Sequence, residues 1–197
     1  MKQTTCSWCL ADKNLRIYHD EEWGLPVHDD GVLFEHLALE IMQGGLNWRL
    51  ILNRRDVLRH ALAGFTPDSL ALFTEKDIDS ALAVPEMIHS RRKIEAIIHN
   101  ARILPELQKK HGSFHDWLWR FTDGRMLVYK SHALQLPSKN NLSDTISAEL
   151  KKKGFRHIGS VTVYSMLQAC GIINDHSPMC PRFHEVMHGM DITFLDE

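Results

Sequence analysis

Long apolar runs, abundant cysteine and a strong excess of one charge are all missing from this sequence of 197 residues. It holds no stretch of about 18 apolar residues, and its first residues lack the apolar core of a secretory signal, so we expect a cytoplasmic protein without a membrane partner. Four cysteines are too few and too scattered for a disulfide scaffold, which favours metal binding or free thiols. A net charge of −2 argues against indiscriminate coating of nucleic acid, but it permits a local DNA-binding face.

The chain does have enough apolar residues, 44% of the total, to bury a substantial core. Helical periodicity recurs along it, whereas convincing strands, internal repeats and low-complexity tracts are absent, so we predict an all-α protein. Residues 1–180 are expected to form a single domain of two helical lobes. The tail, residues 181–197, loses clear pattern, which is compatible with partial disorder. A monomer is the default expectation.

Helix starts and stops follow from capping residues, glycines and prolines. Residues 1–28 have little periodicity and are expected to be irregular. A short link at 84–88 leads into a longer helix on which Ile94, Ile97, Ile98 and Ala101 recur at helical spacing. Further helices are predicted over residues 30–43, 48–63, 67–73, 74–83, 114–121, 143–153 and 160–171.

The stretch from Leu37 to Trp48 departs furthest from what packing alone requires. On a helical wheel, Glu40 lies almost directly above Leu33, at the edge of an apolar face where a carboxylate rarely stands without a partner. Gly44 and Gly45 then end the helix, and Asn47 can cap a second helix that begins at Trp48. An acid and an indole at one tight corner suit a flat, electron-poor or cationic ligand. The alternative is a carboxylate that reaches solvent beside a core tryptophan.

Metal-binding residue types gather at both ends of the chain. Cys6 and His19 lie near the start, and His176 and Cys180 lie near the end. Such a set prefers tetrahedral Zn²⁺, and four protein ligands leave no open position, so one Zn²⁺ there would be structural. However, Cys6 and Cys9 form a C-x₂-C pair, and spacing cannot choose between Cys9 and His19.

The helix after the 84–88 link begins with three basic residues, Arg91, Arg92 and Lys93. Unpaired backbone N–H groups at a helix start carry partial positive charge, so this hairpin could hold a phosphate. The signal is weak alone, because most helical hairpins bind nothing and a basic cluster is usually a solvated helix face.

The sequence resembles the DNA-3-methyladenine glycosylase I family of the helix-hairpin-helix glycosylase superfamily over most of its length, from Cys6 to about Cys180. The most specific motifs place Tyr18-His-Asp20 and Glu22-Trp-Gly24 upstream of Glu40-x-x-Gln-x-Gly-Leu-x-Trp48. The remaining matches are Trp8, Leu39, Lys93-Ile94, Asn100-Ala101, Gly154-Phe155, Gly159, Tyr164-Ser165, Gln168-Ala169 and Asn174-Asp-His176.

This resemblance implies an all-α, helix-hairpin-helix DNA glycosylase fold whose terminal segments are joined by one structural Zn²⁺. It assigns the Zn²⁺ ligands as Cys6, His19, His176 and Cys180, which makes Cys9 a bystander. Glu40 becomes the catalytic residue. The base pocket would be lined by Trp8, Tyr18 and Trp48, and DNA phosphate would be held by Met87, Ile88, Arg91, Arg92 and Lys93.

The implied activity is DNA repair on double-stranded DNA with alkylated bases: 3-methyladenine is flipped out and excised by hydrolysis of its N-glycosidic bond. Many relatives with this hairpin use an essential aspartate after it, but the resembling family lacks that acid, and we interpret Asp116 as a helix-surface charge. Two departures stand out. Leu15 replaces a tyrosine, which removes a stacking surface, and Glu86 at the hairpin would repel phosphate.

Three other functions are compatible with parts of the sequence. A catalytically silent protein could recognise alkylated or distorted duplex DNA through the same pocket. A zinc hydrolase would need an open coordination position for a metal-bound water. A helical scaffold without a ligand would leave Glu40 beside Trp48 unexplained.

Overall fold

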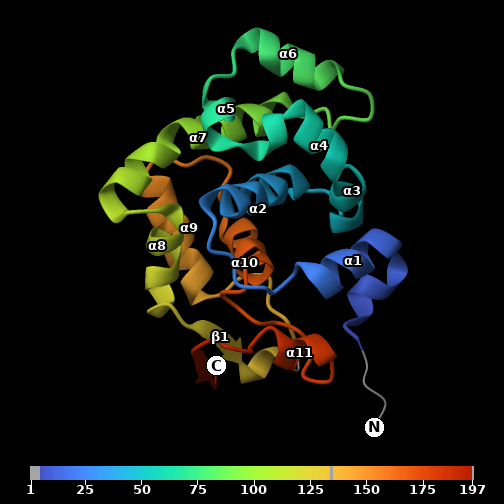
Figure 1. Cartoon of the computed structure of the whole chain (residues 1–197), viewed down its shortest axis with the longest axis vertical. Coiled ribbons are helices and arrows are strands. Elements are labelled where there is room, and N and C mark those ends of the chain that lie inside the picture. Colours follow the sequence, from blue (N-terminus) through green and yellow to red (C-terminus); the bar gives the residue numbers. More distant parts are fainter. Residues whose placement is uncertain (1–4, 134, 197) are drawn as a thin grey trace.

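The computed structural model describes residues 5–133 and 135–196, and helices make up most of it (Figure 1). In chain order its short 3-10 helices are η1 (Ser7–Ala11), η2 (Ala63–Phe65), η3 (Arg120–Thr122) and η4 (Lys130–Ala133). The α-helices and strands are α1 (Lys13–Glu21), α2 (Asp30–Gln43), α3 (Trp48–Asn53), α4 (Arg55–Ala61), α5 (Pro67–Ala71), α6 (Glu75–Ala83), α7 (Arg91–His111), α8 (Phe114–Trp119), β1 (Met126–Tyr129), α9 (Asn141–Lys152), α10 (Ser160–Ala169), α11 (Pro181–Glu185) and β2 (Ile192–Leu195). None of the helices in these ranges is long and apolar enough to cross a membrane.

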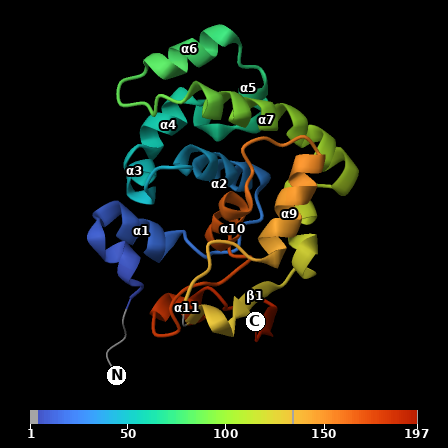
Figure 2. The same ribbon diagram turned by 180° about the vertical axis from the view of Figure 1, so that it is seen from behind.

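Helix α2 lies at the centre of the molecule, where α3, α7, α8 and α10 contact it (Figures 1 and 2). Asp29 caps its start by accepting a hydrogen bond from the N–H of Val32. Every residue from Leu33 to Met42 is buried, because neighbours cover the helix on all sides. The predicted apolar face is confirmed, and Glu40 is enclosed with it.

The single helix predicted over residues 48–63 is wrong, because the chain breaks at Arg54 into α3 and α4. The break has a tertiary cause. Arg55, the first residue of α4, forms ion pairs with Glu22 at 2.6 Å and with Glu35 at 2.7 Å, and all three side chains are largely buried. Charged groups in such a setting require partners, so these contacts outweigh continuous helical propensity.

Regular structure also appears where we expected none. Residues 13–21 form α1, whose start is capped by Asp12. Beyond Pro181, where the sequence has no clear pattern, α11 and β2 are found, and β2 pairs in parallel with β1 in a two-stranded sheet. The expected absence of strands was therefore wrong, because four-residue strands are too short to show an alternating pattern.

The predicted helix, short link and helix are present as α6, residues 84–90 and α7. A capping box between Thr74 and Asp77 starts α6. Glu86 adopts a φ of 66° in the turn, a conformation that glycine tolerates best, and its carboxylate pairs with Arg54. The pairing partly neutralises the charge that would repel a phosphate.

Candidate functional site

Glu40, in the last turn of α2, is 4% exposed, and none of the described residues hydrogen-bonds its carboxyl group. Burial raises the pKa of Glu40 from 4.5 to about 8. An unpartnered buried acid costs folding free energy, so such a group usually marks a place where a ligand completes the hydrogen bonding.

Glu40 lines a cavity of about 570 Å³ that four aromatic residues also line. The rings of Tyr18 and Trp48 lie 5.3 Å apart between centroids, and Trp8 lies 6.4 Å from Tyr18. The structure thus brings Glu40 together with the three residues, Trp8, Tyr18 and Trp48, that the family resemblance assigned to the base pocket. The complete lining is Trp8, Ala11, Leu15, Tyr18, Trp23, Glu40, Gln43, Asn47, Trp48, Arg49, Leu136, Ser165 and Gln168.

The chemistry of this cavity combines one acid with several aromatic faces. Burial, and then the nearby Glu40 and Glu22 carboxylates, raise the pKa of Tyr18 well above its usual value, so its hydroxyl keeps its proton. Aromatic faces attract cations, as does a carboxylate. Leu15 contributes an apolar wall, which adds contact area without a ring face. The site therefore suits a flat cationic ligand.

The corner between α2 and α3 positions Glu40 and Trp48. Gly45 has a φ of +80°, and the side-chain amide of Gln43 donates to the Leu46 carbonyl at 3.1 Å. Asn47 accepts a hydrogen bond from the Leu50 N–H at 2.8 Å and thereby caps α3, which confirms the prediction from sequence. These local contacts help to fix the corner between the two helices.

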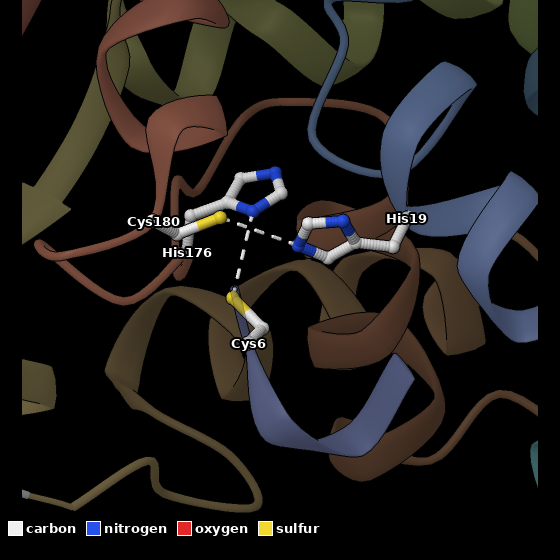
Figure 3. Close-up of side chains that lie close together, drawn as sticks. All are labelled: Cys6, His19, His176 and Cys180. Carbon is white, nitrogen blue, oxygen red and sulfur yellow. Dashed lines mark hydrogen bonds between the residues drawn. The ribbon is translucent and has the colours of Figure 1, made fainter. Parts of the chain in front are cut away.

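Four buried side chains converge where the terminal segments meet, as Figure 3 shows: Cys6, His19, His176 and Cys180. Their ligand atoms all lie within 4.8 Å of one another. Cys6 Sγ is 3.7 Å from His176 Nδ1, and Cys180 Sγ is 3.5 Å from His19 Nε2. Tetrahedral zinc, with bonds of about 2.0–2.3 Å, separates its ligand atoms by roughly 3.3–3.8 Å. The donor set and its spacing therefore fit a metal ion of this type.

Surrounding groups hold these side chains in the orientation that a metal requires. His19 Nδ1 contacts the Asp20 carboxylate at 2.7 Å, and His176 Nε2 lies 3.1 Å from the Trp23 carbonyl, which leaves the other nitrogen of each ring facing the cluster. Burial lowers the pKa of His176 to about 4, so its ring is neutral, as a ligand must be. The thiol of Cys9 instead donates to the Cys6 carbonyl, outside the cluster.

The residues predicted to grip phosphate have different environments. Met87 is buried and its N–H donates to the Val84 carbonyl, while Arg91 forms ion pairs with Glu75 and Asp79. Lys93 donates to the carbonyls of Met42 and Gly44, at the end of α2. Among the described residues, nothing accepts a hydrogen bond from the Arg92 guanidinium or from the Ile88 N–H.

The sequence did not indicate a role for some residues of the site. Leu136, Ser165 and Gln168 were given no role, although they line the cavity with Glu40. Leu136 lies in an irregular stretch, and the other two come from α10, whose apolar pattern marks packing and gives no sign of a pocket. Asp116, by contrast, is 59% exposed on α8, which agrees with its interpretation as a surface charge.

Comparison with known proteins points to one family. The sequence profile described as methyladenine glycosylase matches residues 8–184. DNA-3-methyladenine glycosylase 1 of Escherichia coli (strain K12) is 36% identical over 176 residues, which cover 89% of this chain and 94% of that protein. DNA-3-methyladenine glycosylase of Haemophilus influenzae is 37% identical over 180 residues, or 90% of this chain and 97% of that protein.

Solved structures agree with the sequence comparison. A single-residue variant of 3-methyladenine DNA glycosylase I in complex with 3-methyladenine superposes with a TM-score of 0.85 at 33% identity, and the match covers 92% of this chain and 97% of that one. Fold, sequence and length all correspond, and this chain belongs to the methyladenine glycosylase family.

Proposed function

We propose that this protein is a DNA repair glycosylase that flips 3-methyladenine out of alkylated duplex DNA and hydrolyses its N-glycosidic bond. The observation that carries the proposal is the unpartnered Glu40 carboxyl group in an aromatic cavity. The family membership supports it, as does the 3-methyladenine complex of a relative with the same fold.

The substrate's own charge makes the chemistry simple. A 3-methylated adenine is cationic while bound to its sugar, so its glycosidic bond is already weak. When that bond breaks, the bonding electrons neutralise the base, and no acid is needed to protonate the leaving group. Water adds its oxygen to C1′ of the sugar and gives up a proton.

The role proposed for Glu40 is therefore selection and electrostatic stabilisation. In the empty site its raised pKa keeps the carboxyl group largely protonated at neutral pH. A cationic ring between Trp48 and Tyr18 would favour the ionised form, whereas neutral adenine would not. Cation–π contact contributes about 2 kcal/mol when desolvated, and tenfold discrimination needs about 1.4 kcal/mol.

For DNA, the α6–α7 hairpin is the proposed phosphate contact, in a helix-hairpin-helix arrangement. Ile88 supplies a free backbone N–H, and Arg92 supplies a guanidinium without an ion pair among the described residues. The buried side chain of Met87 would hold the turn in place by packing against the core. Lys93 would act indirectly by joining the hairpin to α2, and Arg91 would have to exchange its carboxylate partners for phosphate.

We propose further that the Cys6, His19, His176 and Cys180 cluster holds one structural Zn²⁺. The two thiols and two imidazoles fit its preferred ligands, and all four positions would be filled by protein. The ion would then stabilise the joined terminal segments without activating water, so a zinc hydrolase is not favoured.

Glu40→Gln should lower the release of 3-methyladenine from methylated DNA by roughly a hundredfold, because a neutral amide cannot pair with the cationic base. Release is measured by chromatography of the freed bases. Asp116→Asn is the matched control and should retain full activity. The mechanism is wrong if Asp116→Asn abolishes release and Glu40→Gln does not, and duplex binding by wild type without release would indicate a non-catalytic binder.

Glu40→Gln should also change how stability depends on pH. The folded protein holds the Glu40 proton up to about pH 8, whereas the unfolded chain loses it near 4.5, so this group costs stability as pH rises between those values. The variant cannot ionise, so its free energy of unfolding relative to wild type should rise by up to about 4 kcal/mol from pH 4 to pH 9. Urea unfolding at both pH values measures this, and an equal difference at both would refute the raised pKa.

Arg92→Ala should weaken duplex binding similarly for every sequence and reduce the salt dependence of binding by about one phosphate contact. Fluorescence anisotropy across a salt series measures both quantities. Lys110→Ala, at the far end of α7, controls for the loss of a positive charge. An unchanged salt slope for Arg92→Ala would remove this residue from the DNA interface.

Purified protein should contain one zinc ion per chain, and chelation should lower its thermal stability. Cys180→Ala should lose the metal, while Cys9→Ser should keep it, because Cys9 lies outside the cluster. Metal analysis and thermal unfolding of the three proteins test this. Full metal content in Cys180→Ala, or loss of metal in Cys9→Ser, would contradict the ligand set.

A further inference from the structure

A buried carboxylate stands directly behind the cavity wall that α10 provides. Asp175 has a fully buried side chain that no assignment above uses. It accepts a hydrogen bond from the Tyr164 hydroxyl at 2.5 Å and from the Gln168 amide at 2.7 Å, and its second oxygen lies 2.7 Å from His132 Nδ1. Of these three partners, Gln168 also lines the cavity that contains Glu40.

The contact with Asp175 determines which end of the Gln168 amide is free. A carboxylate accepts hydrogen bonds and donates none, so the NH₂ end of Gln168 must face Asp175. The carbonyl oxygen is then the opposite end, and no donor among the described residues reaches it. The wall of the cavity thus presents a hydrogen-bond acceptor of fixed identity, in addition to the acid and the rings.

The rest of the network resists rotation of this amide. Tyr164 is 2% exposed, and the His132 ring stacks on Tyr129 with 4.5 Å between centroids. Turning Gln168 over would place its carbonyl against the Asp175 carboxylate and leave a buried acceptor without its donor, which is costly. The orientation of Gln168 is therefore built into the fold before any ligand arrives.

We propose that Gln168 selects adenine-derived over guanine-derived lesions by accepting a hydrogen bond from the 6-amino group of the flipped base, and that Asp175 is its positioning residue. This inference rests on the function proposed above. Adenine carries an amino donor at ring position 6, whereas guanine carries a carbonyl acceptor there. A guanine lesion would set that carbonyl against the Gln168 carbonyl, and a site with a mismatched buried polar group rejects such a base.

Two variants test the proposal through the ratio of 3-methyladenine to 3-methylguanine released from methylated duplex DNA. Gln168→Leu removes the acceptor, so the ratio should fall about tenfold through slower adenine release. Asp175→Asn should have a larger effect, because the new amide can donate to the Gln168 carbonyl and turn the NH₂ group toward the pocket. That donor matches guanine, so 3-methylguanine release should rise relative to wild type.

Tyr164→Phe is the matched control, because it removes one donor to Asp175 but leaves the bond to Gln168. Its ratio should equal that of wild type, and metal content and thermal unfolding verify that each variant folds. The proposal is overturned if this ratio is unchanged in Gln168→Leu and Asp175→Asn, including the case in which the release of both bases falls equally. In that case the proposed glycosylase function still holds if wild type releases 3-methyladenine and Glu40→Gln does not. If folded wild type releases no base, both fail.

Discussion

The candidate site depends on one electrostatic feature. The Glu40 carboxyl group is buried among apolar and aromatic side chains, and none of the described residues forms a hydrogen bond with it. Water would stabilise its charge and the protein does not, which is why its pKa rises to about 8. The burial of the apolar side chains of α2 offsets this cost. A cation that entered the cavity would stabilise the ionised carboxylate, and this stabilisation would favour its binding.

The terminal segments complete the pocket that α2 begins. On α1, Tyr18 lines the cavity and the next residue, His19, belongs to the Cys/His cluster. Successive residues on a helix point about 100° apart, so fixing His19 also fixes where the Tyr18 ring lies. Trp8 likewise follows Cys6 by two residues. The cluster is thus the anchor for one aromatic wall, although it is built from residues more than 150 positions apart in the chain.

Local structure could be predicted from short-range rules, whereas long-range contacts were predicted only where residue chemistry and the family resemblance pointed to them, as in the Cys/His cluster. The apolar face of α2, its end at Gly44 and the cap at Asn47 all follow from short-range rules. The break at Arg54 depends on ion pairs that Arg55 makes with distant carboxylates, and β2 pairs with a strand far earlier in the chain. Pocket roles for Tyr18, Trp8 and Trp48 came from resemblance to a family. Nothing in the spacing of Gln168 and Asp175 shows that they touch.

The contact of Lys93 with the carbonyls of Met42 and Gly44 couples the hairpin to the helix that carries Glu40. One side chain thus joins three separate parts of the chain: the start of α7, the end of α2 and the glycine corner. If the hairpin contacts DNA phosphate as proposed, the distance between that contact and the Glu40 cavity is set by the protein before binding. Under the proposed function, a mismatch between this distance and straight B-form DNA would be met by bending and unstacking of the duplex, which costs least at a damaged base.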